Sequence, residues 1–203
     1  MLTEETQYNA TARRILGAAR VLFMQRGYRA VSITDIVQAA DVTKPTLYYH
    51  FADKEALFVE MSLQVLREMQ ARFDAAIDAG APLAAQLVAL TETMRSADDM
   101  DSRMLRHEIR EHVPPARQQQ IAEAFLAHMV APVVAVMARG LARGDLIGRS
   151  SHELAWLFFG FAEGFYQHPG TDVQPYQHPI EAMSTAALVD LFLYGVAART
   201  PHT

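Results

Sequence analysis

The 203-residue sequence contains no cysteine, which excludes disulfide bonds and thiolate metal sites. Its first residues include Glu4 and Glu5 and lack the apolar stretch of a signal peptide. The apolar runs at 129–138 and 154–162 are much shorter than the ~20 residues that a membrane-spanning helix needs. We therefore expect a cytoplasmic protein without a membrane partner.

Sequence motifs of the common enzyme classes are missing as well. The chain has no phosphate-binding loop, nucleophile elbow or dinucleotide fingerprint, so no cofactor is expected. Alternating strand patterns and internal repeats are also absent, whereas apolar residues recur at helical spacing. With 51% hydrophobic residues, the chain is predicted to be all-α with a substantial core.

Basic residues are scarce and unevenly distributed. The net charge is −5, yet residues 10–54 carry seven basic and three acidic side chains, which leaves a net charge of −9 on the rest. Both lysines of the protein, Lys44 and Lys54, fall within this segment. A positive region on an acidic protein favours specific binding to DNA over nonspecific coating of it.

The segment 32–54, SITDIVQAADVTKPTLYYHFADK, predicts a helix-turn-helix. Ser32 is the expected cap of the first helix, with Asp35 reaching back as a shortened capping box. Asp41 tolerates left-handed backbone angles and is the expected turn residue. Between them, an apolar stripe facing the core is formed by Ile33, Ile36, Val37 and Ala40.

The second helix is predicted to begin at Thr43 and to last about two turns. Pro45 lies in its first turn, where a missing N–H breaks no helical bond. Leu47 and Phe51 are four residues apart and are expected to face the core. Asp53 is the expected cap of the next helix.

The remaining side chains of this segment fit contact with DNA. A helix-turn-helix places the start of its second helix in the major groove. There Lys44 and Thr46 would contact base edges, while the tyrosine hydroxyls, His50 and Lys54 would hold phosphates. Helix pairs with short turns also occur in proteins that bind no DNA, so the charge distribution is what favours DNA here.

Residues 10–60 resemble the DNA-binding domain of the tetracycline-repressor (TetR) family of bacterial transcriptional regulators. The resemblance rests on PTLYYHF at 45–51, KEAL at 54–57, and Ala19, Leu22, Phe23, Gly27 and Tyr28 before them. It implies a homodimeric repressor of a palindromic DNA operator, released by a small-molecule effector. It also implies base or phosphate contact by Thr34, Thr43, Lys44, Pro45, Thr46, Tyr48, Tyr49, His50 and Lys54. Asp41 departs from the glycine often found in the turn of this family.

We divide the chain into a three-helix DNA-binding domain at 1–52 and a helical regulatory and dimerisation domain at 53–203. A first helix ends near Gly27, and a helix at 53–78 connects the two domains. About nine helices are expected, interrupted by a polar break at 96–101 and a loop at 168–178. Pro132 should kink the helix at about 116–143, which Gly144 ends.

The last two helices, at about 151–167 and 179–198, are the expected dimer interface. The first has apolar side chains on most of its faces, so other helices must pack on more than one of its sides. The predicted interface residues are Trp156, Gly160, Gly164, Ala182, Ala186, Val189 and Phe192. The alternative is that both helices fill the core of a monomer.

A small, largely apolar effector is expected to bind among the C-terminal helices, as the resemblance implies. The predicted lining is Met94, Met104, His107, Phe125, Met129, Trp156, Phe159 and Glu163. Ten methionines suit an adaptable cavity, although ordinary core packing explains the same residues.

Two other functions remain open. One is a helix-turn-helix protein that senses no small molecule and acts as an architectural or protein-controlled DNA binder. The other is a metal-dependent enzyme that uses His107 and His112, but histidines five apart diverge by about 140° on a helix and cannot share one metal. His107 with Glu111, or Glu108 with His112, supplies two ligands without a third. We therefore predict no metal and no catalytic residue.

Overall fold

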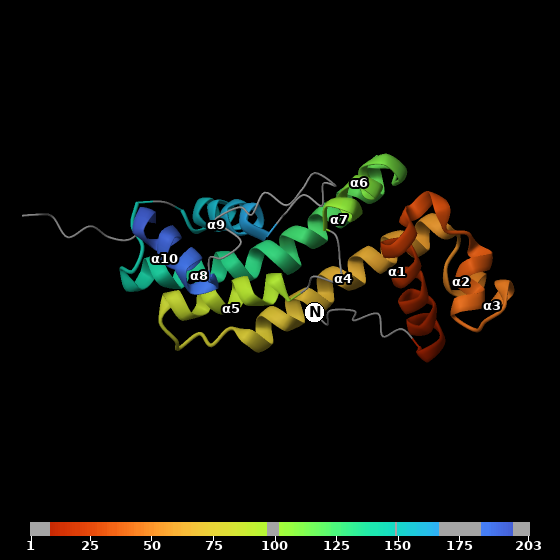
Figure 1. The fold of residues 1–203 in the computed structure, drawn as a ribbon, viewed down its shortest axis with the longest axis horizontal. Helices are drawn as coiled ribbons and strands as arrows, with labels where there is room; N and C mark the ends of the chain where they lie inside the picture. Colours follow the sequence, from red (N-terminus) through yellow and green to blue (C-terminus); the bar gives the residue numbers. More distant parts are fainter. Residues whose placement is uncertain (1–8, 97–101, 149, 167–183, 197–203) are drawn as a thin grey trace, which may run out of the picture. The chain divides into compact units, whose positions relative to one another are not determined.

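The computed structural model describes residues 9–96, 102–148, 150–166 and 184–196, whose helices are drawn in Figure 1. The elements are α1 (Ala10–Ala30), α2 (Ile33–Ala39), α3 (Lys44–His50), α4 (Lys54–Ala76), α5 (Leu83–Arg95), α6 (Ser102–His112), α7 (Pro115–Phe125), the π-helical turn η1 (Leu126–Val130), α8 (Ala131–Arg143), α9 (Ser151–Tyr166) and α10 (Thr185–Val196). The described residues include no strand, which confirms the all-α prediction. Elements α7, η1 and α8 form one continuous helix, called the rod below, and counting it once gives nine helices among the described residues, against about nine expected.

The described residues pack as two compact units, and these divide the chain at positions other than the predicted boundary after residue 52. Unit 1 contains the residues up to Arg67 and those from 102 to Ala124. Unit 2 contains those from Glu68 to 96 and from Phe125 onward. Helix α4 and the rod each contribute residues to both units.

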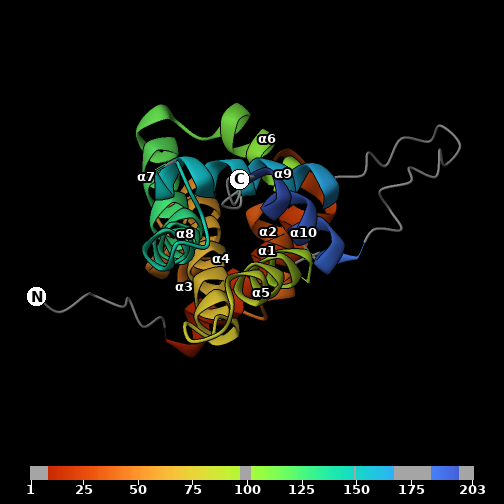
Figure 2. The same ribbon diagram turned by 90° about the vertical axis from the view of Figure 1, so that its left-hand side faces the viewer.

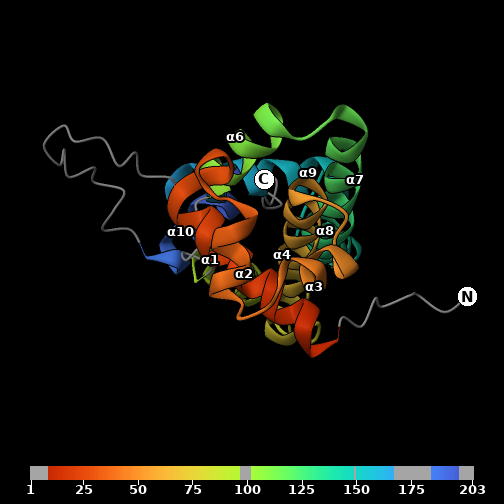
Figure 3. The ribbon, with the colours of Figure 1, turned by 90° about the vertical axis from the view of Figure 1, so that its right-hand side faces the viewer.

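The core of unit 1 is built on α1, and Figure 3 is turned so that α1, α2 and α3 face the viewer. Helices α2, α3 and α6 all pack against α1. The side chains that α1 buries in this core include those of Ala12, Ile15, Ala19, Leu22 and Phe23. Helices α6 and α7 belong to this unit because Val113 and Ile121 are buried in the same core, with Leu105 and Ile109 packed against it.

Unit 2 consists of the end of α4 with α5, η1, α8, α9 and α10. Helix α8 packs on α9, and α10 packs on α5, and Figure 2 is turned so that these helices face the viewer. Leu87, Val133 and Phe158 are fully buried where these helices meet. Helix α4 contributes Met69 and Phe73 to this core.

The disturbance expected at Pro132 takes the form of the π-helical turn that directly precedes it. Proline has no N–H to donate and its ring clashes with the carbonyl four residues earlier, so the helix widens before it. Gly144 ends the rod as predicted, with a left-handed φ of 79°.

The rod, Pro115–Arg143, has 29 residues and is much longer than the apolar run at 129–138 that it contains. By length and composition alone it satisfies the criteria for a membrane span, with a mean hydropathy of 1.9 in its most apolar window. Four of its apolar side chains, those of Val130, Val133, Val136 and Met137, are buried in the core of unit 2.

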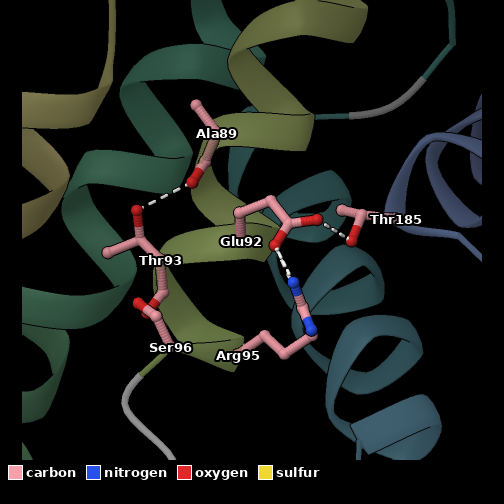
Figure 4. A network of polar contacts seen from close by, with 6 residues as sticks. All are labelled: Ala89, Glu92, Thr93, Arg95, Ser96 and Thr185. Atoms are coloured by element: carbon pink, nitrogen blue, oxygen red, sulfur yellow. Dashed lines mark hydrogen bonds and ion pairs between the residues drawn. The ribbon is translucent and has the colours of Figure 1, made fainter.

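A polar network joins the end of α5 to the start of α10 (Figure 4). The hydroxyl of Thr185 donates to the carboxylate of Glu92, which also accepts a hydrogen bond of 3.0 Å from Nε of Arg95. The hydrogen bond from Thr185 and then that from Arg95 lower the pKa of Glu92. Thr185 is buried, so the first residue of α10 is anchored by a carboxylate.

Helix α1 is broken at Gly27, where φ is 74° and ψ is 165°. Side chains other than glycine rarely adopt this conformation. A Cβ at this position would also lie 2.7 Å from Oε1 of Glu108. Gly17 lies in the same helix with no atom within 4 Å of a Cβ, so only Gly27 is required by the fold.

We predict that Gly27→Ala and Gly17→Ala shift stability in opposite directions. Gly27→Ala should lower the free energy of unfolding by about 1–3 kcal/mol, because alanine is strained at positive φ. Gly17→Ala should raise it by roughly 0.5–1 kcal/mol, because alanine is the better helix former. Urea unfolding of both variants measures this, and a shift of the same sign in both would contradict the assigned break.

Candidate nucleic-acid interface

The start of α2 is held by the predicted capping box, which the structure confirms. The backbone N–H of Ser32 donates to Oδ2 of Asp35 at 2.8 Å, and the N–H of Asp35 donates to Oγ of Ser32 at 3.1 Å. The carboxylate of Asp35 accepts two hydrogen bonds from Ser32, first that of the hydroxyl at 2.6 Å and then that of the N–H, and both lower its pKa. Ile36 and Val37 are buried, which fixes the face that α2 turns to the core.

The turn between α2 and α3 depends on Asp41, whose φ of 50° is left-handed as predicted. The N–H of Val42 donates to the carbonyl of Val37 at 3.0 Å and closes the turn. The side chain of Arg14 also donates to the carbonyl of Asp41 at 3.2 Å. The sequence contains no signal for this bond, because the partners are 27 positions apart and every residue has a carbonyl.

Helix α3 is capped and anchored as predicted. The N–H of Thr46 donates to Oγ1 of Thr43 at 3.3 Å, and the two hydroxyls share a further hydrogen bond of 2.8 Å. Pro45 lies in the first turn. Leu47 is fully buried and Phe51 is 5% exposed, so this seven-residue helix is attached to the core by one face.

The other face of α3 carries most of the predicted DNA contacts. The exposed side chains on or beside it are those of Thr34, Thr43, Lys44, Pro45, Tyr48 and Tyr49, while Thr46 and His50 are partly exposed. Tyr49 is 84% exposed and Tyr48 is 50% exposed, which is unusual for large aromatic side chains. The ring of Tyr49 packs edge-on against that of His50 at 5.0 Å. The structure thus brings eight of the nine predicted residues onto α2, α3 and their junction.

Lys54, the ninth, begins α4 and is partly buried. Asp53 caps this helix by accepting a hydrogen bond of 2.6 Å from the N–H of Ala56, as predicted. Nζ of Lys54 lies 4.2 Å from the centre of the Tyr28 ring. Burial lowers the pKa of Lys54, and the charge of Glu108 opposes this shift. The contact between Lys54 and Tyr28 was not predicted, because the two residues are far apart in the sequence.

The predicted dimer residues fall into two groups. Trp156, Gly160 and Ala186 are exposed, whereas Val189 and Phe192 are buried in the core of unit 2. Gly164 falls within α9, and Ala182 lies outside the described residues.

Exposed apolar side chains occur on the same two helices. Leu157 of α9 and Leu191 of α10 are 53% and 49% exposed, although α9 and α10 pack on each other. An open hollow of about 430 Å³ also lies on α9, lined by His152, Glu153, Trp156 and Leu157.

The predicted effector lining does not fall within one unit. Met104 and the exposed His107 belong to unit 1, and the other six residues belong to unit 2. Three of these six form an aromatic cluster: the rings of Phe125, Trp156 and Phe159 lie 6.1–6.3 Å apart. Met94 and Met129 pack against the same core, and Glu163 is partly exposed.

The histidines of α6 differ in their surroundings. His107 is exposed, while Nε2 of His112 lies 3.3 Å from Oε2 of Glu108. Within the described part of the chain, no three His, Asp or Glu side chains are grouped to hold a metal ion.

Known proteins resemble this chain most strongly at its N-terminal helices. Residues 15–61 match the family model described as bacterial regulatory proteins, tetR family. The HTH-type transcriptional regulator QacR of Staphylococcus aureus is 46% identical over 48 residues, which is 24% of this chain and 26% of that protein. UidR of Escherichia coli, also an HTH-type transcriptional regulator, is 38% identical over 69 residues, 34% of this chain and 35% of that protein. The matches thus span about a quarter to a third of these curated relatives.

Similarity of fold extends further along the chain than similarity of sequence. The structure of a TetR family protein from Vibrio parahaemolyticus aligns with a TM-score of 0.71, covering 93% of this chain and all of that one, at 19% identity. At this level of identity the alignment shows a shared fold. The N-terminal helices at 15–61 are thus similar to the DNA-binding region of bacterial regulatory proteins of the tetR family, and the chain shares the fold of that TetR family protein.

Proposed function

We propose that this protein is a cytoplasmic, homodimeric transcriptional repressor that binds a palindromic DNA operator and is released by a small, largely apolar effector. Helix α3 would lie in the major groove, with Lys44 and Thr46 at base edges. The hydroxyls of Tyr48 and Tyr49, with His50 and Lys54, would hold phosphates.

The observation that carries this proposal is the two-sided character of α3. Leu47 and Phe51 anchor one face in the core, and the opposite face exposes Lys44, Tyr48 and Tyr49. Exposed tyrosines beside a lysine suit a polyanion, because the hydroxyls donate to phosphate and the ammonium group neutralises it. The positive charge of residues 10–54 on an acidic protein supports the same partner.

The proposed dimer is supported by the apolar side chains that α9 and α10 leave exposed. Trp156, Leu157 and Leu191 are each about half exposed on helices that pack on each other. A second copy of the same face would cover them by two-fold symmetry, and a dimer matches a palindromic operator.

The proposed effector site is supported by the aromatic cluster in unit 2. Phe125, Trp156 and Phe159 lie beside the π-helical turn η1, where the helix is already widened. Such turns are frequent at functional sites, and Met94 and Met129 offer adaptable apolar surface nearby.

DNA binding is tested with the two lysines, using a duplex recovered by selection from a random pool. Lys44→Ala should weaken binding by about 1–3 kcal/mol and relax the sequence preference, because it removes a base contact. Lys54→Ala should weaken binding to all duplexes similarly and lower the salt slope by about one, because it removes a phosphate contact. Arg110→Gln, which removes a charge from the exposed face of α6, is the control. Unchanged affinity and salt dependence in both lysine variants would refute the assigned face.

The dimer is tested by Leu157→Glu, with Ile147→Glu as the control. Both side chains are about half exposed in unit 2, but only Leu157 lies on α9. A buried glutamate in the interface is costly, so Leu157→Glu should shift sedimentation from dimer to monomer at micromolar concentration. Ile147→Glu should sediment as the parent protein does. The proposal fails if the parent protein is monomeric or if both variants behave alike.

The effector is tested with Trp156, the only tryptophan of the protein, as a fluorescent reporter. A compound that binds beside it should change its emission, raise the melting temperature and weaken binding to the selected duplex. Phe125→Ala should reduce all three effects. A library of apolar compounds in which none changes both emission and DNA affinity would favour a DNA binder without a small-molecule effector.

A further inference from the structure

A connected cluster in unit 1 joins Lys54 to a histidine and a carboxylate of α6. Nζ of Lys54 lies over Tyr28 at 4.2 Å, and the Tyr28 ring stacks on that of His112 at 5.3 Å with 21° between the planes. Nε2 of His112 lies 3.3 Å from Oε2 of Glu108. The cluster therefore brings α1, α4 and α6 together at a lysine that the proposed function assigns to DNA.

Glu108 is confined and incompletely paired. Its side chain is only 14% exposed, and Oε2 is buried with no hydrogen bond, since His112 lies near it without the directed geometry of one. Its other oxygen packs against Gly27, 2.7 Å from where a Cβ would be. A buried carboxylate with so little solvation exerts a strong field on nearby cations. Its charge acts to keep Lys54 protonated, against the burial that lowers the pKa of this lysine.

We propose that Glu108 and His112 are positioning residues for Lys54, and that protonation of His112 sets how strongly Lys54 binds DNA phosphate; this rests on the proposed function. With His112 neutral, Glu108 attracts the Lys54 ammonium group and holds it over Tyr28, in competition with phosphate. With His112 protonated, its charge offsets that of Glu108, so Lys54 is released to DNA. Affinity for DNA therefore rises as the pH falls.

The cluster holds one imidazole, that of His112, among several charged side chains. The charged groups around the cluster are Glu108 of α6, Lys54 and Glu55 of α4, Asp53 before it, Arg117 of α7 and Asp35 of α2. Glu55 and Arg117 form an ion pair with each other at 3.2 Å. Burial, followed by the charges of Glu55 and Asp53, raises the pKa of Tyr28, so this hydroxyl stays neutral. Imidazole is the side chain that ordinarily changes charge between pH 6 and 8.

The first test needs no DNA and uses the fact that Lys44 and Lys54 are the only lysines. Reductive methylation with ¹³C-formaldehyde labels both side chains, with Lys44 exposed as an internal control. The Lys54 resonance should shift between pH 8 and 6, while that of Lys44 should not. His112→Gln should abolish the shift, and His107→Gln, an exposed histidine on the same helix, should preserve it. A Lys54 resonance that titrates equally in both variants would overturn the proposal.

The second test measures affinity for the selected duplex from pH 8 to 6. For each protein, the affinity at pH 6 is divided by its own affinity at pH 8. This ratio should be about fivefold larger for the parent protein and for His107→Gln than for His112→Gln. Scaling removes the contribution of His50, which all three proteins share. Glu108→Gln keeps the side-chain volume and should bind tightly and evenly across this range.

The outcomes separate this inference from the proposed function. If Glu108→Gln and His112→Gln weaken binding equally at every pH, the pair is merely structural and the inference is wrong. If no protein binds any duplex, the proposed function is wrong, and the lysine resonances still decide whether His112 acts on Lys54.

Discussion

The attachment of α3 depends on burying Leu47 and Phe51. A helix of seven residues is too short to be stable in water, where about 12–15 residues are needed even for good helix formers. Full burial of one leucine contributes about 1.5–3 kcal/mol, which exceeds what a single cap provides. The buried and the exposed side chains alternate along the same two helical turns. The direction in which Lys44 and Tyr49 point is therefore set by the core beneath them.

That core is not made by the three N-terminal helices alone. Val113 and Ile121 are buried in it, and the break at Gly27 places Tyr28 against Phe58 and His112. The break at Gly27 thus also places the Tyr28 ring under the ammonium group of Lys54. Helix α6 follows in sequence long after the helix-turn-helix, yet it is part of the same packing unit. Through the charge of Glu108, α6 acts on Lys54, the first residue of α4.

The sequence was most informative where structure is decided by near neighbours. The capping box of Ser32 and Asp35, the left-handed Asp41 and the burial of Leu47 all depend on residues within a few positions of one another, and the structure confirms them. Contacts between distant segments were missed, such as Arg14 with the carbonyl of Asp41 and Tyr28 with Lys54. Helical periodicity identifies an apolar face but not the element that covers it. For this reason α6 and α7 were assigned to the regulatory domain, and Val189 and Phe192 were predicted at an interface although the chain buries them itself.

The exposed apolar side chains of unit 2 and the polar face of α3 answer one physical requirement. A single small DNA-binding module buries only about 600–1,000 Å² and reads few base pairs, so one copy of α3 gives weak discrimination. When two copies are linked, the second binds at a high effective concentration, and the specificity of the two half-sites multiplies. That gain exists only if the link is stable, which requires an apolar surface of the kind that Trp156, Leu157 and Leu191 expose. The proposed DNA contacts of α3 therefore need the proposed dimer contacts of α9 and α10, because neither set alone accounts for specific binding.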